Sequence, residues 1–138
     1  ADLTAECEDV ERFIDEVGGI DYLVLGMGMN GHIALNEPGS TFSSRARAVS
    51  LDDTTRRVGQ KYFDGPTALT GGVTLGVADL CAARRIAVAI YGAHKADAAR
   101  AAVEGAISEE LPASAPRRVG ALYVFDEAAA SLLSRAGS

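Results

Sequence analysis

The sequence has little cysteine, no excess of positive charge and no long apolar run, and each shortage excludes a class of protein. Cys7 and Cys81 lie far apart and lack metal-ligand spacing, so we expect two reduced thiols and no disulfide framework. Acidic residues outnumber basic ones by 19 to 13, and the net charge of −6 repels nucleic acid phosphates. We therefore expect no nucleic acid partner.

Signals for membranes and export are also missing. The longest apolar runs are far shorter than the ~18 residues that a membrane-spanning helix needs. The start of the chain lacks the basic segment and apolar stretch of a secretory signal. The sequence therefore predicts a cytoplasmic protein without a membrane partner.

The apolar content is sufficient for one folded domain with a core. Apolar residues make up 48% of the 138 positions, which excludes a disordered or fibrous chain. Apolar runs predict strands at residues 22–25, 86–91 and 120–125, with a weaker strand at 46–51. Helical spacing and capping residues predict helices at residues 4–17, 52–63, 77–83, 96–104 and 127–135. The polar and proline residues of 105–119 indicate a loop.

Strands that alternate with helices predict an α/β fold with a Rossmann-like, mainly parallel sheet flanked by helices. The first strand, residues 22–25, is typical of a parallel strand buried on both faces. The chain opens in a helix and offers only three strong strands. We therefore expect residues 1–138 to be one portion of a larger α/β domain.

The most informative segment is residues 22–40, where the first strand runs into glycines and then into Asn30, His32 and Glu37. Gly28 and Gly31 allow a backbone path that is closed to larger residues. Ligands of open α/β sheets bind at the carboxyl ends of the strands. The segment therefore predicts a functional site at this turn.

The run Asn-Gly-His-Ile-Ala-Leu-Asn-Glu-Pro-Gly at residues 30–39 resembles the signature of the glucosamine-6-phosphate deaminase (isomerase) family, with Leu35 in place of the usual Phe. Further matching segments follow in order at residues 43–47, 62–64, 74–77, 92–96 and 101–105. The resemblance covers nearly the whole chain but only the carboxyl-terminal half of the family's length. The family's Gly-Gly-Ser-Thr-Pro-like phosphate loop and its base aspartate for C2 have no match here, so we expect the chain alone to be inactive.

This resemblance implies the conversion of glucosamine 6-phosphate and water to fructose 6-phosphate and ammonia in amino sugar catabolism, without a metal or another cofactor. His32 would exchange a proton with the sugar ring oxygen, and Glu37 would orient and tune the imidazole. Asn30 would hold the imidazole through a hydrogen bond. Lys95 and Lys61 match the positions that bind the substrate phosphate, and Lys61 stands where the family often has Arg.

In allosterically activated family members, the positions of Ser40, Arg47, Val49 and Ser50 line a site for N-acetylglucosamine 6-phosphate. Val49 replaces the basic residue expected at its position. The sequence therefore argues against allosteric activation.

Other functions remain open at the level of the sequence. Galactosamine 6-phosphate differs from the glucosamine substrate in one hydroxyl group, to which we tie no residue. A related 6-phosphogluconolactonase would carry Gly-His-Thr-Ala-Ser-Leu-Phe-Pro, against which Ile33 and residues 36–37 argue. A sugar-phosphate sensing module would use the same fold for binding only. In each case the partner is a phosphorylated sugar, and the chain is compatible with a homo-oligomer.

Overall fold

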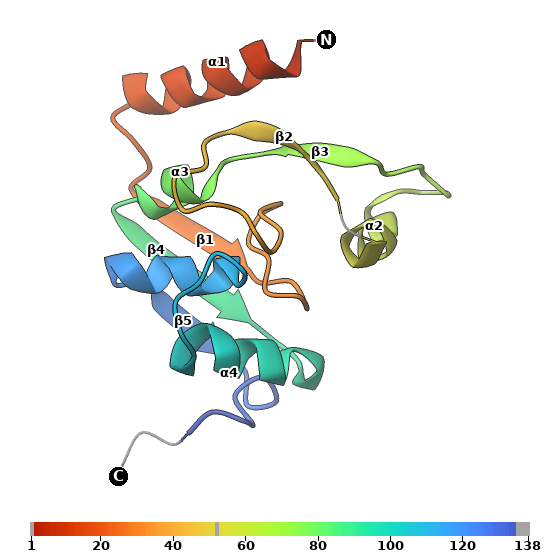
Figure 1. The fold of residues 1–138 in the computed structure, drawn as a ribbon, viewed down its shortest axis with the longest axis vertical. Coiled ribbons are helices and arrows are strands. Elements are labelled where there is room, and N and C mark those ends of the chain that lie inside the picture. Colours follow the sequence, from red (N-terminus) through yellow and green to blue (C-terminus); the bar gives the residue numbers. More distant parts are fainter. Residues whose placement is uncertain (1, 52, 135–138) are drawn as a thin grey trace.

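The protein consists of a parallel sheet with helices and a separate two-stranded ribbon (Figure 1). The computed structural model describes residues 2–51 and 53–134. In chain order the elements are α1 (Leu3–Glu16), β1 (Tyr22–Gly26), β2 (Arg47–Ser50), α2 (Asp53–Gly59), η1 (Gln60–Tyr62), β3 (Gly71–Thr74), α3 (Val77–Cys81), β4 (Arg85–Ile90), η2 (Ala93–Lys95), α4 (Ala96–Glu104), η3 (Pro112–Val119) and β5 (Leu122–Phe125), where η denotes a 3₁₀ helix. Among the described residues, no helix combines the length and the apolar character that crossing a membrane requires.

The main sheet has the strand order β1-β4-β5, and all neighbouring strands are parallel. In its register Leu25 pairs with Val88, and Ile90 pairs with Phe125. The predicted α/β fold with a mainly parallel sheet is therefore confirmed. The weaker strand expected at residues 46–51 forms as β2, but it pairs antiparallel with β3 in a second sheet. Because the three strands of the main sheet run the same way, their carboxyl ends meet at one edge.

The core lies on one face of the main sheet. Val88 and Ile90 of the central strand are fully buried there. Leu80 of α3 packs in the same cluster, together with Ala99 and Ala102 of α4. The small alanine side chains allow α4 to approach the sheet closely, and this packing fixes the strand ends that carry the site.

The opposite face of the same sheet is open to solvent in the described part of the chain. Val24 of β1 is 66% exposed and Leu122 of β5 is 60% exposed. The expectation that β1 is buried on both faces is therefore wrong for this structure. The reason is that the described helices that build the core pack against the other face, where Leu25 is buried.

Helix α1 lies beside the β2–β3 ribbon rather than against the main sheet (Figure 1). Asp2 caps its start by accepting a hydrogen bond from the backbone N–H of Thr4 at 3.1 Å. Near its middle, Glu11 accepts hydrogen bonds from the backbone N–H of Ala46 at 2.7 Å and from the Arg45 side chain at 3.1 Å. The bond from Arg45 lowers the pKa of Glu11. These contacts connect α1 to the segment that leads into β2.

The loop predicted over residues 105–119 is only partly correct, because its second half forms the 3₁₀ helix η3. This 3₁₀ helix contains Pro112 at its start, where the missing N–H costs no helical bond, and Pro116 further along. Ser114 stabilises this turn by donating a hydrogen bond from Oγ to the carbonyl of Leu111 at 2.7 Å. Ala113 is fully buried in the core, so the segment covers the sheet instead of projecting from it.

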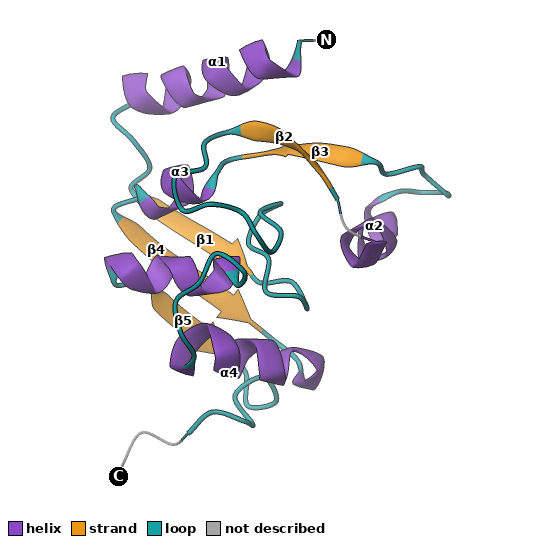
Figure 2. Ribbon diagram, in the orientation of Figure 1, coloured by secondary structure: helices purple, strands orange, loops and turns teal. Residues whose placement is uncertain are grey.

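The closing helix predicted over residues 127–135 is wrong for the described residues, which form turns and loop after β5 (Figure 2). Arg135 itself lies outside the described residues. The carboxylate of Asp126 accepts hydrogen bonds from the backbone N–H of Ala129 at 2.8 Å and of Gly92 at 3.0 Å. These two hydrogen bonds hold the segment against the loop after β4. In so short a segment, the few helical hydrogen bonds would not offset the free-energy cost of nucleating a helix.

Candidate active site

A glycine-rich turn at the end of β1 places the imidazole of His32. The backbone N–H of Gly28 donates to the carbonyl of His32 at 2.9 Å, and that of Gly31 donates to the carbonyl of Gly28 at 3.0 Å. Gly31 has a φ of +83°, which other residues rarely adopt. A Cβ atom on Gly28 would overlap the His32 ring. Glycine at position 28 therefore lets the imidazole lie directly against the backbone.

Asn30 lies between the imidazole of His32 and the carboxylate of Glu37. Its Oδ1 is 2.6 Å from His32 Nδ1 and accepts a hydrogen bond from the backbone N–H of His32 at 3.1 Å. Its Nδ2 donates to Glu37 Oε2 at 2.7 Å. The direct distance from Glu37 Oε2 to His32 Nδ1 is 3.8 Å. Glu37 thus reaches the imidazole mainly through the amide of Asn30.

This order of groups defines which ring nitrogen carries the proton. An ionised carboxylate only accepts hydrogen bonds, so the amide of Asn30 must present Nδ2 to Glu37 and Oδ1 to His32. Oδ1 in turn requires a proton on His32 Nδ1. The other ring nitrogen, Nε2, is then the one that remains for proton exchange with a ligand.

Thr55 of α2 supplies a second hydrogen bond to the same carboxylate. Its Oγ1 donates to Glu37 Oε1 at 2.6 Å and lies 3.5 Å from His32 Nδ1. The side chain of Glu37 is only 15% exposed. Both carboxylate oxygens therefore have donors, one from the glycine turn and one from α2.

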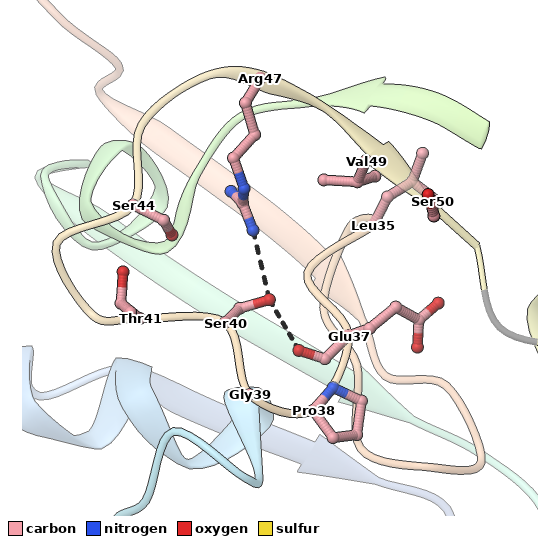
Figure 3. A pocket seen from close by; sticks show the side chains of 10 residues that line it. All are labelled: Leu35, Glu37, Pro38, Gly39, Ser40, Thr41, Ser44, Arg47, Val49 and Ser50. Atoms are coloured by element: carbon pink, nitrogen blue, oxygen red, sulfur yellow. Dashed lines mark hydrogen bonds between the residues drawn. The ribbon is translucent and has the colours of Figure 1, made fainter.

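The turn that carries Glu37 is tied to the ribbon by Arg47 and Asn36. Arg47 Nη1 donates to Asn36 Oδ1 at 2.9 Å, and Arg47 Nη2 donates to Ser40 Oγ at 3.2 Å. Ser40 Oγ donates to the carbonyl of Glu37 at 2.6 Å. Asn36 is fully buried and donates Nδ2 to the carbonyl of Leu75 at 2.9 Å. These bonds hold both ends of the turn and leave the Glu37 side chain to extend away from Ser40 (Figure 3).

Figure 3 shows the pocket of about 470 Å³ that Arg47 enters from β2. Ser40, Arg47, Val49 and Ser50, the four positions considered in the sequence for an allosteric ligand, all line it. Among the described residues that line it, Arg47 is the one cation, and Val49 offers only an apolar surface. The guanidinium of Arg47 is already hydrogen-bonded to Asn36 and Ser40.

A second pocket, of about 620 Å³, lies at the carboxyl ends of β1 and β4 and has His32 in its wall. Lys61 and Lys95 line the same pocket, although they come from different parts of the chain. Gly28 also contributes to its lining. The structure therefore brings His32 and both predicted phosphate-binding lysines to one cavity, with Asn30 and Glu37 hydrogen-bonded behind the imidazole.

The turn that carries Lys95 is held by Asp126, which the sequence motifs did not indicate. Lys95 stands where the 3₁₀ helix η2 leads into α4. Asp126, just after β5, accepts the backbone N–H of Gly92 at the start of this turn. Backbone hydrogen bonds from Ala129 and Gly92 lower the pKa of Asp126. The position of an aspartate directly after a predicted strand was the available signal, because neighbouring parallel strands end at the same edge.

Lys61 lines the pocket from a different segment, in η1 after α2. Its Nζ lies 5.0 Å from the centre of the Tyr62 ring, within range of a cation–π interaction. The residue is exposed and its ammonium is accessible to a ligand. A phosphate in this pocket would therefore meet cations carried by two separate segments.

Nowhere in residues 2–51 and 53–134 do three or more His, Cys, Asp or Glu side chains gather closely enough to hold a metal ion. Cys7 and Cys81 are free thiols, and burial raises the pKa of Cys81. The side chains present at the site, His32, Lys61 and Lys95, can transfer protons and bind anions.

The sequence of this chain places its α/β fold in a known family. Residues 1–124 match the family model of glucosamine-6-phosphate isomerases/6-phosphogluconolactonase, and the chain belongs to this family. The chain is 42% identical over 115 residues to glucosamine-6-phosphate deaminase 1 of Bacillus subtilis (strain 168), covering 83% of this chain and 48% of that protein. It is 44% identical over 133 residues to glucosamine-6-phosphate deaminase 2 of Xenopus tropicalis, covering 92% of this chain and 47% of that protein. The chain thus spans about half the length of these curated relatives.

Two solved structures share the fold of this chain. A monomeric glucosamine-6-phosphate deaminase superposes with a TM-score of 0.89 at 40% identity, covering 95% of this chain and 55% of that one. The 6-phosphogluconolactonase from Trypanosoma cruzi superposes with a TM-score of 0.70 at 16% identity, covering 93% of this chain and 51% of that one. The second similarity concerns the fold alone.

Proposed function

We propose that the protein containing this chain is a glucosamine-6-phosphate deaminase, and that residues 1–138 form the carboxyl-terminal portion of its α/β domain. The observation that carries the proposal is the hydrogen-bonded series His32, Asn30 and Glu37 beside a pocket lined by two lysines. Relatives named as deaminases at 42% and 44% identity support the same reaction. The substrate is then a phosphorylated amino sugar, and the enzyme is cytoplasmic.

His32 serves the opening of the sugar ring. Its Nε2 accepts the proton of the O1 hydroxyl group and returns a proton to the ring oxygen as the bond between C1 and the ring oxygen breaks. The products of this step are an aldehyde at C1 and a hydroxyl at C5, and the histidine ends in its starting state. Glu37 stabilises the transient imidazolium through Asn30.

Lys95 and Lys61 bind the phosphate of the substrate. Lys95 stands at the N-terminus of α4, where the helix dipole and the ammonium both favour a dianion. Lys61 adds a point charge from η1, a separate segment of the pocket lining. The proton shift from C2 to C1 and the loss of the amine need a further base, which we assign to the part of the family fold outside this chain.

The proposal is tested by assaying the natural gene product that includes this sequence. Ammonia and fructose 6-phosphate should form from glucosamine 6-phosphate, with slower release from galactosamine 6-phosphate. Hydrolysis of 6-phosphogluconolactone without ammonia release would replace the deaminase with the lactonase. Binding of the sugar phosphates without turnover of any of them would indicate a sensing module.

The deaminase is preferred over the lactonase because of the residues at the turn. The lactonase similarity rests on structures such as the one at 16% identity, which share the fold. Asn36 and Glu37 are both hydrogen-bonded into the site, and both depart from the lactonase signature at this turn.

A further inference from the structure

Thr55 contacts the carboxylate that the proposed mechanism uses, although it lies in α2 and outside the glycine turn. Its hydroxyl donates to Glu37 Oε1 at 2.6 Å, a distance typical of a charge-assisted O–H···O⁻ bond. The other carboxylate oxygen accepts from Asn30 at 2.7 Å. The plane of the Glu37 carboxylate is therefore fixed at both oxygens.

We propose that Thr55 is a positioning residue that holds Glu37 in the orientation needed by the relay through Asn30 to His32. The inference rests on the proposed function. Thr55 lines the same pocket as His32, and its proposed role there is to act through Glu37 rather than to bind the sugar or its phosphate.

The hydroxyl group of Thr55, rather than its size, carries this role. With its proton committed to Glu37, Thr55 Oγ1 turns lone pairs toward His32 Nδ1 at 3.5 Å. The Thr55 hydroxyl group therefore contacts both ends of the relay. It donates a hydrogen bond to the Glu37 carboxylate, and its oxygen lies beside the imidazole of His32. Valine has nearly the same shape and lacks both functions, whereas serine keeps them.

The same bond connects the relay to the segment that carries a phosphate-binding lysine. Thr55 lies in α2, and Lys61 follows in η1 of the same continuous segment. Figure 1 shows α2 at the far end of the β2–β3 ribbon, away from the core of the main sheet. Placement of this segment over the pocket therefore brings Lys61 to the phosphate and the Thr55 hydroxyl to Glu37 together.

The test compares Thr55→Val and Thr55→Ser in the natural gene product that includes this chain, with Thr70→Val as the matched control. Thr70 is exposed in the segment before β3 and undergoes the same chemical change. On glucosamine 6-phosphate, Thr55→Val should lower kcat about tenfold with little change in KM, because a hydrogen bond to a charged group is lost. Thr55→Ser and Thr70→Val should stay within about twofold of the parent enzyme.

A double-mutant cycle separates positioning from a structural role. In a Glu37→Ala background, Thr55→Val should cause no further loss of kcat, since the group through which Thr55 acts is gone. Losses that multiply in the double variant, or a Thr55→Ser variant as slow as Thr55→Val, would overturn the inference.

A structural measurement keeps this inference separate from the proposed function. In crystals of the Thr55→Val variant, the Glu37 carboxylate should rotate or occupy more than one conformer, while it stays fixed in Thr55→Ser. An unmoved Glu37 in Thr55→Val contradicts the positioning role even if deaminase activity is found. A parent enzyme without deaminase activity rejects the proposed function, and the response of Glu37 still decides whether Thr55 positions it.

Discussion

Asn30 Oδ1 lies 2.6 Å from His32 Nδ1, which makes a neutral amide the direct partner of the imidazole. The amide also donates to Glu37, so a substitution affects two bonds at once. Asn30→Ala removes both and should lower kcat roughly 100-fold. Asn30→Asp keeps an acceptor for His32 and should lower kcat only about tenfold near pH 7.

The loss in Asn30→Asp should shrink as the pH is lowered. An aspartate at this position places two carboxylates in contact, and they share a proton more readily in acid. The shared proton restores the donor to Glu37. Steady-state kinetics over pH 5.5 to 8 provide the check, and equal losses in both variants at every pH would contradict it.

His32→Gln should act selectively on the cyclic form of the substrate. If the imidazole moves a proton to the ring oxygen, an open-chain substrate bypasses that step. We expect kcat to fall about 100-fold on the cyclic sugar and less than tenfold on the open form. Glu37→Gln should act in the same direction and more weakly, because the proton carrier remains.

Lys95→Ala gives the contrasting pattern, with KM raised about tenfold for both forms and kcat little changed. Equal slowing of both substrate forms by His32→Gln would assign ring opening to another group.

Gly28→Ala tests whether the imidazole depends on the glycine turn. The added Cβ would overlap the His32 ring, so the ring must move away from Asn30. We expect kcat to fall at least about tenfold, with a stability loss of about 1 kcal/mol. Gly65→Ala is the control, because a Cβ there meets nothing within 4 Å. Full activity of Gly28→Ala would show that the ring has room to adjust.

Much of this fold was predictable from local sequence. Helix α4 forms at residues 96–104 as expected, because alanines at helical spacing and a following Gly105 define it. The strands at residues 86–91 and 120–125 were also predicted, since each is a short apolar run. The segments that were mispredicted, 105–119 and the described part of 127–135, lie beside contacts with distant residues. The backbone N–H of Ala113 donates to the carbonyl of Gly31, and Asp126 accepts a hydrogen bond from the backbone of Gly92.

The site was predictable only within the glycine turn. Asn30, His32 and Glu37 are close in sequence, so their grouping follows from one motif. Thr55 is 18 residues from Glu37 in the sequence and lies in the helix expected at residues 52–63, outside the glycine turn. Its contact with Glu37 depends on how the β2–β3 ribbon places α2, which local periodicity does not encode.

Asp126 provides a test of stability against pH. Hydrogen bonds from the backbone of Ala129 and Gly92 lower its pKa in the folded state, so its ionised form stabilises the fold. This contribution is complete above the ordinary aspartate pKa of about 3.9 and is lost as the pH falls through the lowered value. The free energy of unfolding should therefore fall more steeply below about pH 4 in the parent chain than in Asp126→Asn. Denaturant titrations of both proteins measure the two slopes, and parallel slopes would contradict the assigned role.

The exposed face of the main sheet leads to a prediction about association. Val24, Ala87 and Leu122 pair in one row across β1, β4 and β5, and the two outer side chains are largely exposed. An apolar sheet face of this kind associates with other surfaces in water. The 138-residue chain on its own should therefore self-associate and bind the dye ANS. Light scattering over a concentration series measures the association.

Lysine at positions 24 and 122 tests whether self-association arises from this sheet face and whether additional residues cover the face in a longer gene product. In the isolated chain, Val24→Lys with Leu122→Lys should raise the monomer fraction, whereas Val73→Lys on the ribbon should leave it unchanged. In a gene product whose additional residues cover the sheet, the same pair buries two charges and should destabilise the fold by roughly 3 kcal/mol or more. A higher monomer fraction in the isolated chain together with a lower stability of the longer gene product would identify this face as the one that the rest of the family fold covers. A stable, ANS-negative monomer of the unmodified chain at high concentration would show instead that the face needs no cover.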